Sequence, residues 1–149
     1  MVGGNDWSSA ERWIEQSDTL KYLKDPANNL AFEAHVYFDK DASGTYKYSY
    51  EEEECYPEKG IDRVKPFVEW IKQNKFHGFI GEYGIPDNDP RWNETLDLFL
   101  GYLQENGING TYWAAGPWWD TYFMAITPKD GKDRPQMPII EKYTSTFKK

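Results

Sequence analysis

Residues 77–82, "HGFIGE", form a short apolar segment that ends in a glutamate and lies between two stretches with helical periodicity. Before it, apolar side chains recur at helical spacing: Ile61, Val64, Phe67, Val68 and Ile71. After it, they recur again until Gly107: Trp92, Leu96, Phe99, Leu100 and Leu103. A short apolar run between two amphipathic helices predicts a buried strand, and strands that alternate with helices predict a parallel sheet.

The alternation continues on both sides of this segment. Residues 29–38, "NLAFEAHVYF", and 108–115, "INGTYWAA", predict two more strands, while residues 1–7, "MVGGNDW", resemble the end of a fourth strand and its loop. Residues 138–147 predict a closing helix with Ile139, Ile140, Tyr143 and Phe147 on one face. We therefore expect an α/β fold with parallel, right-handed βαβ units.

Local signals predict where the helices begin. Ser8 with Glu11 three residues later is a capping-box pattern, which predicts a helix through Trp13 and Ile14. Asp89 before Pro90 is a typical start of the helix over residues 92–103, and Pro66 is expected in the first turn of the preceding helix. The polar residues 39–60 predict a long loop.

Length and charge limit the possible functions. The chain has 149 residues, enough for one unit spanning 1–149, and a formal net charge of -8, which disfavours nucleic acid and anionic membranes as partners. No segment reaches the roughly 18 apolar residues that span a bilayer, no signal peptide is recognisable, and Cys55 has no second cysteine to pair with. An aromatic content of 17% suits sugar binding, because pyranose rings stack on flat side chains.

Polar and aromatic side chains gather at the predicted strand ends, where active sites of parallel α/β proteins lie. Glu33, His35 and Tyr37 alternate along one strand and so share a face. Three other strand ends contribute further candidates: Glu82 from residues 77–82, Trp113 from residues 108–115, and Asn5 with Trp7 from the first segment. This arrangement favours a sugar-cleaving site.

Each candidate also has a structural interpretation. His35 is alternatively a hydrogen-bonded core histidine, and Glu82 a group that caps the next turn or pairs with Arg91. Trp118 and Trp119 are alternatively a cover for the edge of the sheet.

Other chemistries find less support in the sequence. The acidic run 51–54 is interpreted as a solvated loop face, with a calcium site as the alternative. His77 lies at the wrong end of its strand for catalysis, and the two histidines and one cysteine show no metal-ligand spacing. Nucleophile-elbow and phosphate-loop patterns are also missing, so we expect no cofactor and no metal.

Four segments, in order along the chain, strongly resemble glycoside hydrolase family five, the retaining cellulases with a (β/α)8 barrel. These segments are residues 3–13 "GGNDWSSAERW", 33–45 "EAHVYFDKDASGT", 81–84 "GEYG" and 111–119 "TYWAAGPWW". Residues 25–30, "DPANNL", resemble the approach to that family's sixth strand. The resemblance covers nearly the whole chain.

The resemblance implies roles for individual residues. Glu82 would be the catalytic nucleophile, with His35 and Tyr37 as active-site residues and Tyr37 donating a hydrogen bond that favours the ionised nucleophile. Trp113 would be the platform beneath the sugar that is cleaved. The neighbouring subsites would be lined by Trp7, Trp118 and Trp119, with Asn5 beside them, although Asp120 and Thr121 depart from the family's usual Gly and Asp after "PWW".

One required group is missing from this sequence. Retaining hydrolysis uses two carboxyl groups, and the family's Asn-Glu-Pro motif, which carries the acid/base, does not occur here. The only Asn-Glu pair, Asn93 and Glu94, falls in a predicted helix, and Glu33 is expected to support the site rather than act as the acid. A complete barrel has ~250 residues, so the chain is expected to correspond to strands five to eight, the C-terminal half of the barrel.

The sequence thus predicts a secreted retaining endo-β-1,4-glucanase region that acts on cellulose or another β-glucan. We expect it to be completed by an N-terminal half-barrel, to self-associate, or to be a fragment of a longer enzyme, because a half barrel leaves two parallel edges open. The alternatives are a non-catalytic carbohydrate-binding half-domain and a structural half-barrel that forms dimers.

Overall fold

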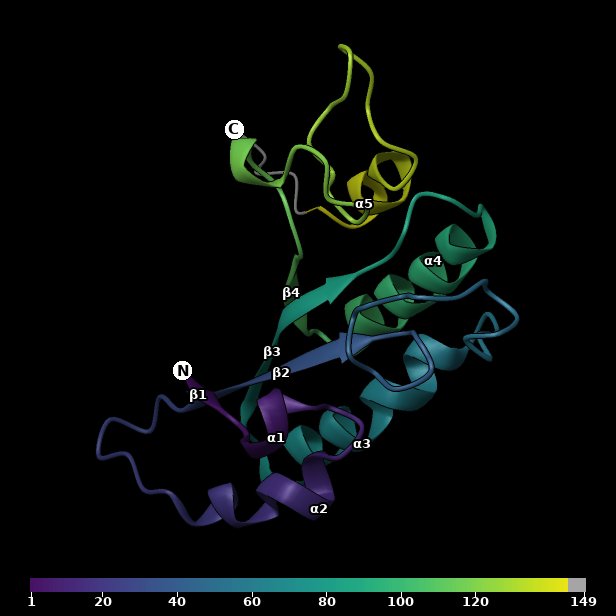
Figure 1. Ribbon diagram of the computed structural model, residues 1–149. Helices are drawn as coiled ribbons and strands as arrows, with labels where there is room; N and C mark the ends of the chain where they lie inside the picture. Colours follow the sequence, from purple (N-terminus) through teal and green to yellow (C-terminus); the bar gives the residue numbers. More distant parts are fainter. Residues whose placement is uncertain (145–149) are drawn as a thin grey trace.

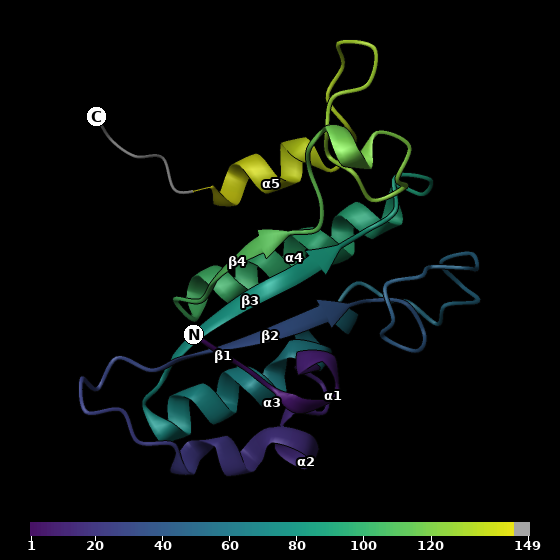
Figure 2. The same cartoon turned by 60° about the vertical axis from the view of Figure 1, so that its left-hand side comes forward.

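A computed structural model describes residues 1–144 of the chain, and within them four parallel strands form one sheet. The strands are β1 (Val2–Gly3), β2 (Ala31–Tyr37), β3 (His77–Gly84) and β4 (Asn109–Tyr112), and they lie side by side in sequence order (Figures 1 and 2). Their carboxyl ends therefore meet at one edge. The predicted parallel α/β fold, including the short first strand, is confirmed.

Helices follow the strands and cover one face of the sheet. The short helices α1 (Asn5–Ser8) and α2 (Trp13–Ser17) and the 3-10 turn η1 (Asp18–Tyr22) come between β1 and β2. The long helices α3 (Lys59–Asn74) and α4 (Arg91–Glu105) follow β2 and β3, and both lie along the same side of the sheet (Figure 2). The 3-10 turn η2 (Pro117–Trp119) and helix α5 (Met137–Tyr143) follow β4, and α5 packs beside α4.

The core lies between the sheet and these helices, and it is rich in aromatic rings. Phe32 and Ala34 lie two residues apart on the helix-facing side of β2, and both are fully buried. Its ring lies 5.0 Å from that of Trp70 of α3, edge to face, while Trp13 of α2 lies 4.7 Å from Phe67. Alternation along β2 therefore directs the remaining side chains, those of Glu33, His35 and Tyr37, to the opposite face.

The predicted capping box at Ser8 is wrong. Helix α2 begins at Trp13, and Ser8 lies in a segment with left-handed backbone geometry, at φ 56°. Its hydroxyl accepts a hydrogen bond from the backbone N–H of Gly4 at 2.6 Å and so does not cap a following turn.

The predicted place of Pro66 is also wrong, because α3 begins earlier than its apolar periodicity indicates. Lys59 and Gly60 already belong to the helix, and Pro66 lies in its interior. The Lys59 amine donates hydrogen bonds to the carbonyls of Glu53 and Glu54, at 2.7 and 3.1 Å, which joins the first turn to the preceding loop. Pro66 itself is half-buried.

The ends of α4 follow the predicted signals. Asp89 accepts a hydrogen bond from the backbone N–H of Arg91 at 2.9 Å, at the start of the helix. Gly107 has φ 66°, and Ile108 donates to the carbonyl of Leu103 just after the helix. Gly107 thus takes the left-handed conformation that commonly ends helices.

Two further predictions need correction, and a third lies partly outside the described residues. Residues 51–54 are not uniformly solvated, since Glu53 is buried and accepts the backbone N–H groups of Lys40 and Tyr48 at 2.7 and 2.9 Å. Strand β4 ends at Tyr112, earlier than predicted. Helix α5 presents Ile140 to the core, whereas Phe147 lies outside the described residues.

Among residues 1–144, none of the helices has the length and apolar character needed to cross a bilayer.

Candidate active site

The carboxyl ends of β2 and β3 bring three of the predicted residues together. The hydroxyl of Tyr37 donates a hydrogen bond to Oε2 of Glu82 at 2.9 Å, and Nδ1 of His35 lies 3.7 Å from the same oxygen. His35 pairs with Glu82 across the two strands. Arg91 instead binds Asp89 and Glu51, so the alternative in which Glu82 pairs with Arg91 is excluded.

Tyr37 is set up as a hydrogen-bond donor. Burial raises the pKa of Tyr37 far above its usual value, and the negative charge of Glu82 raises it further. The hydroxyl therefore keeps its proton at neutral pH. A donor that cannot ionise stabilises the charged form of the carboxylate it faces.

His35 lies between two carboxylates. Its Nε2 is 2.6 Å from Oε1 of Glu33, on the side away from Glu82. The other oxygen of Glu33 is 3.5 Å from the hydroxyl of Ser8. Glu33 thus supports the imidazole from deeper in the sheet, as the sequence predicted for it.

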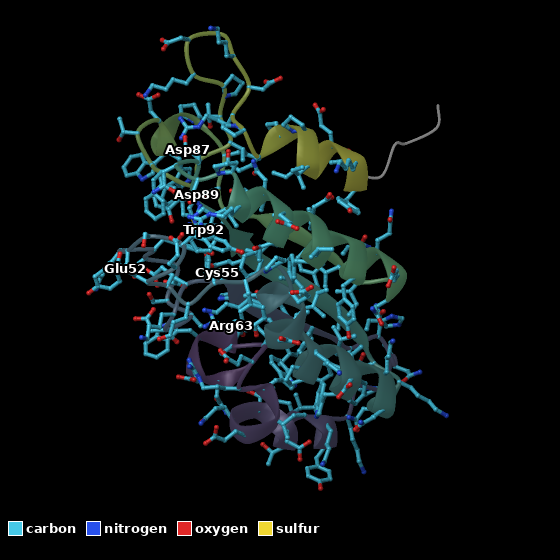
Figure 3. The ribbon with its side chains drawn as sticks, turned by 90° about the vertical axis from the view of Figure 1, so that its right-hand side faces the viewer. Glu52, Cys55, Arg63, Asp87, Asp89 and Trp92 are labelled. Atoms are coloured by element: carbon cyan, nitrogen blue, oxygen red, sulfur yellow. The ribbon has the colours of Figure 1, made fainter. Side chains whose placement is uncertain are left out.

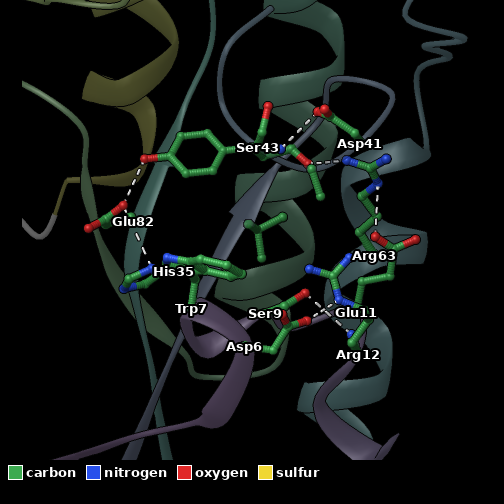
Figure 4. Close-up of a pocket in the computed structure, with 13 residues that line it drawn as sticks. Asp6, Trp7, Ser9, Glu11, Arg12, His35, Asp41, Ser43, Arg63 and Glu82 are labelled. Atoms are coloured by element: carbon green, nitrogen blue, oxygen red, sulfur yellow. Dashed lines mark hydrogen bonds and ion pairs between the residues drawn. The ribbon is translucent and has the colours of Figure 1, made fainter. Parts of the chain in front are cut away.

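A pocket of about 390 Å³ opens in front of these residues (Figure 4). Its wall is formed by α1, the end of β2 and the loop that follows β2. Besides the residues already described, it is lined by Asp6, Trp7, Ser9, Glu11, Arg12, Val36, Asp41, Ala42, Ser43 and Arg63. Figure 4 shows Trp7 beside His35, with the two arginines on the far side of the pocket.

The short segment after β1 presents Trp7 to the solvent. Asp6, Trp7 and Ser8 all have positive φ, between 51° and 56°, which is unfavourable for residues other than glycine. Side chains hold this segment: Arg12 pairs with Asp6, and the Ser8 hydroxyl binds Gly4 N. As a result the indole of Trp7 is 85% exposed at the mouth of the pocket.

A second aromatic group lies after β4. Trp113 donates its backbone N–H to the carbonyl of Tyr83 at 2.8 Å, and its ring lies 5.0 Å from that of Trp119, which is also 5.0 Å from Tyr122. Burial raises the pKa of Tyr122, a hydrogen bond from Trp113 lowers it, and the charge of Glu82 raises it. Tyr122, which the sequence reasoning missed, extends this aromatic group through its contact with Trp119.

The other predicted residues occupy different positions. Trp113 and Trp119 belong to the aromatic group after β4 and not to the pocket lining, while Trp118 projects from η2 with 90% of its surface exposed. The Asn5 side chain donates to the carbonyl of Gln16 at 2.8 Å, which ties α1 to α2 instead of facing the pocket. Trp118 is thus not a cover for the sheet edge.

Arg63 is a site residue that the sequence reasoning missed. It lies on the buried side of α3, and its guanidinium donates to the carbonyls of Tyr37 and Lys40, at 2.5 and 3.0 Å (Figures 3 and 4). An arginine at an apolar position of an amphipathic helix is unusual, and that pattern could have revealed it. It fixes the end of β2, and therefore the position of Tyr37.

The remaining carboxylates of the pocket are engaged elsewhere. Asp6 pairs with Arg12, Glu11 lies 3.5 Å from Arg63, and Asp41 accepts the backbone N–H of Ser43 at 3.2 Å. Within residues 1–144, no three His, Cys, Asp or Glu side chains gather in a way that could hold a metal ion. The arrangement suits chemistry at a single carboxylate, supported by a tyrosine and a histidine.

A family model describing cellulase of glycosyl hydrolase family 5 matches residues 1–118. The chain belongs to glycosyl hydrolase family 5. The sequence resemblance is thereby confirmed, and the parallel sheet corresponds to part of the family 5 barrel.

Relatives of this family 5 chain are endoglucanases. A probable endo-beta-1,4-glucanase B of Aspergillus kawachii is 37% identical over 148 residues, which cover 96% of this chain and 42% of that protein. The crystal structure of Pseudomonas stutzeri endoglucanase Cel5A in complex with cellobiose is 42% identical with a TM-score of 0.88, and the match covers 97% of this chain and 44% of that one. The structure of XacCel5A in complex with cellopentaose is 39% identical with a TM-score of 0.85, covering 96% and 47% of the two chains.

The chain thus spans less than half the length of the relatives it matches. The described sheet of parallel strands, with α3 and α4 on its outer face, is the half of a (β/α)8 barrel that the sequence predicted.

Proposed function

We propose that this chain is the nucleophile-bearing half of a retaining endo-β-1,4-glucanase. One observation carries the proposal: the Glu82 carboxylate lies at the carboxyl end of β3, bound by Tyr37 at 2.9 Å and flanked by His35, beside a pocket with an exposed tryptophan. A carboxylate whose charged form is stabilised, next to an aromatic sugar platform, suits attack on an anomeric carbon.

The proposed reaction proceeds in two balanced steps. An oxygen of Glu82 attacks the anomeric carbon and forms a glycosyl ester, while the glycosidic bond breaks and the leaving oxygen takes a proton from a general acid. Water then attacks the same carbon and loses its proton to that group, now a base, and the carboxylate of Glu82 is released. The two inversions together retain the anomeric configuration.

The substrate class follows from the relatives and from the aromatic side chains. The similar proteins are endo-beta-1,4-glucanases, and two of the similar structures contain cellobiose and cellopentaose. On this chain, Trp113 would lie beneath the sugar that is cleaved, and Trp7, Trp118 and Trp119 would contact sugars on either side. Cellulose and related β-glucans are polymers that lie outside cells, which supports secretion of the enzyme.

The general acid is proposed to come from a complementary half-barrel. Retaining enzymes place their two carboxyl groups about 5–5.5 Å apart. The pocket carboxylates of Asp6 and Glu11 are paired with arginines, and Glu33 contacts His35, so they are poorly placed for this task. The inner face of the sheet, which carries Glu82, is the surface that such a half would cover.

Covalent trapping tests the nucleophile without requiring the general acid. Dinitrophenolate leaves without protonation, so a fluorinated dinitrophenyl β-cellobioside should label the chain at Glu82, as found by mass spectrometry of the peptide that contains β3. Glu82→Gln should abolish labelling, whereas the control Glu69→Gln, an exposed glutamate of α3, should label like the unaltered chain. Labelling of another carboxylate would refute the assignment.

Turnover is tested in a complemented barrel, which we define as residues 1–149 joined to the half of Pseudomonas stutzeri Cel5A that this chain does not match. On carboxymethyl-cellulose, Glu82→Gln should lower kcat by at least about a thousandfold, as expected for loss of a nucleophile. With Glu82→Ala, azide should restore cleavage of the aryl cellobioside and yield an azide of inverted configuration. A complemented barrel without activity would contradict the proposal.

Sugar binding without turnover is the second candidate function of the chain alone. The exposed rings of Trp7 and Trp118, together with engaged carboxylates around Glu82, favour it. Cello-oligosaccharides that quench tryptophan fluorescence without reducing-sugar release would support binding. No fluorescence change would leave only a structural role for the isolated chain.

A further inference from the structure

Strand β3 contains an irregularity immediately before Glu82. Its pairing with β2 goes from Ala34 opposite Ile80 to His35 opposite Glu82, and passes over Gly81. The pairing of β3 with β4 goes from Ile80 opposite Gly110 to Tyr83 opposite Tyr112, so β3 again has one residue more. Gly81 is therefore an extra residue relative to both neighbouring strands, which is a β-bulge.

The bulge decides which way Glu82 faces. Ile80 is fully buried, and Tyr83 is buried with its ring 5.4 Å from Phe99 of α4, so both point toward the helices. Strict alternation would place side chains three residues apart on opposite faces. The extra residue reverses the alternation, and Glu82 faces the pocket instead of the helical layer.

Side chains of β4 and β2 lie against the bulge on the pocket side of the sheet. The Thr111 hydroxyl of β4 donates a hydrogen bond to the carbonyl of Gly81 at 2.6 Å. On the side of β2, a Cβ atom on Gly81 would lie 1.8 Å from Oε1 of Glu33, so the glycine leaves the space that this carboxylate occupies. Glu33 in turn contacts His35, which places the bulge, the imidazole and Glu82 in one connected group.

We propose that Thr111 is a positioning residue for Glu82. Its hydroxyl fixes the Gly81 carbonyl, which keeps the bulge at Gly81 and holds the Glu82 carboxylate within reach of Tyr37. Thr111 acts through the backbone of β3. The catalytic part of this inference rests on the proposed role of Glu82 as nucleophile, while the structural part does not.

A pair of variants tests the hydroxyl. Thr111→Val keeps the branched shape that strands favour and removes the donor, and Thr111→Ser keeps the donor. In residues 1–149, amide hydrogen exchange at Glu82 and Tyr83 should become roughly 3- to 10-fold faster in Thr111→Val, as expected for the loss of one hydrogen bond. Thr111→Ser should stay close to the unaltered chain, as should Thr19→Val, an exposed control in η1.

Kinetics in the complemented barrel test the catalytic part. Thr111→Val should lower kcat roughly 3- to 10-fold with little change in KM, and Thr111→Ser should restore it. A purely structural role would instead accelerate exchange equally in α4 and leave kcat per folded molecule unchanged.

Different results contradict the anchoring of the bulge, the positioning role of Thr111 and the proposed function. Unchanged exchange at Glu82 and Tyr83 in Thr111→Val overturns the anchoring of the bulge, whatever the activity. Faster exchange with an unchanged kcat overturns the positioning role. Full activity of Glu82→Gln overturns the proposed function and the catalytic part of this inference together, and the exchange data then decide the structural part alone.

Discussion

The hydroxyl of Tyr37 lies 2.9 Å from Oε2 of Glu82 and joins the carboxyl ends of β2 and β3. Hydrogen bonds to charged groups contribute about 1.5–3 kcal/mol. Tyr37→Phe in the complemented barrel should therefore lower kcat about 10- to 100-fold, because the carboxylate loses its donor. Steady-state kinetics on an aryl cellobioside measure this, with the exposed Tyr48→Phe as control. An unchanged kcat would show that this hydrogen bond does not assist the reaction.

Two glycines in helices should respond to the same substitution in opposite directions. A Cβ on Gly60 of α3 would lie 2.8 Å from a ring carbon of Phe38, whereas the nearest atom to a Cβ on Gly101 of α4 is the Tyr143 hydroxyl, at 3.5 Å. Gly60→Ala should destabilise the chain by about 1–3 kcal/mol through overpacking. Gly101→Ala should stabilise it by about 0.5–1 kcal/mol, because alanine favours the helix.

Urea unfolding measures both glycine variants in the same buffer. Equal changes in the free energy of unfolding would mean that helix propensity alone determines both effects. The contact between α3 and Phe38 would then not be tight.

Alkaline pH should destabilise the fold through its buried tyrosines. Burial raises the pKa of Tyr83 to about 12 and that of Tyr50 to about 12, above the value near 10 of an unfolded chain. The stabilisation is complete below pH 10 and is lost as the pH rises toward 12, because the unfolded chain releases these protons first. The free energy of unfolding should therefore fall across this window, by roughly 2–3 kcal/mol for Tyr83.

Tyr83→Phe provides the check on this pH dependence. It removes one titrating group, so the decline above pH 10 should become shallower, while the exposed Tyr22→Phe should leave the curve unchanged. Identical slopes for the two variants would exclude Tyr83 as a source of the effect.

The open sheet should not be a stable monomer. Parallel sheets are normally covered on both faces, whereas α3 and α4 cover only one face of this sheet, and β1 and β4 form its two edges. We expect residues 1–149 to self-associate or to bind a complementary half-barrel in size-exclusion chromatography with light scattering. A well-folded species of 17.5 kDa would contradict this expectation.

The pattern of apolar residues predicted the order of the strands and long helices, because burial on one face dictates that pattern, but it misplaced the start of α3 and the end of β4. It also brought His35, Tyr37 and Glu82 to one edge, since the ends of parallel strands meet there. The Ser8 capping box failed because a capping pattern does not reveal a competing partner, here the backbone N–H of Gly4. The bulge at Gly81 was missed because strand register depends on neighbours distant in sequence.

Arg63 links the outer helical layer to the carboxyl end of β2, because its guanidinium binds the carbonyls of Tyr37 and Lys40. Any change that shifts α3 along its axis is thus transmitted to the end of β2. Libraries for directed evolution that sample only the ends of the strands would leave out this connection between α3 and β2. Sampling the α3 positions next to Arg63 offers a way to adjust the end of β2 from the helical layer.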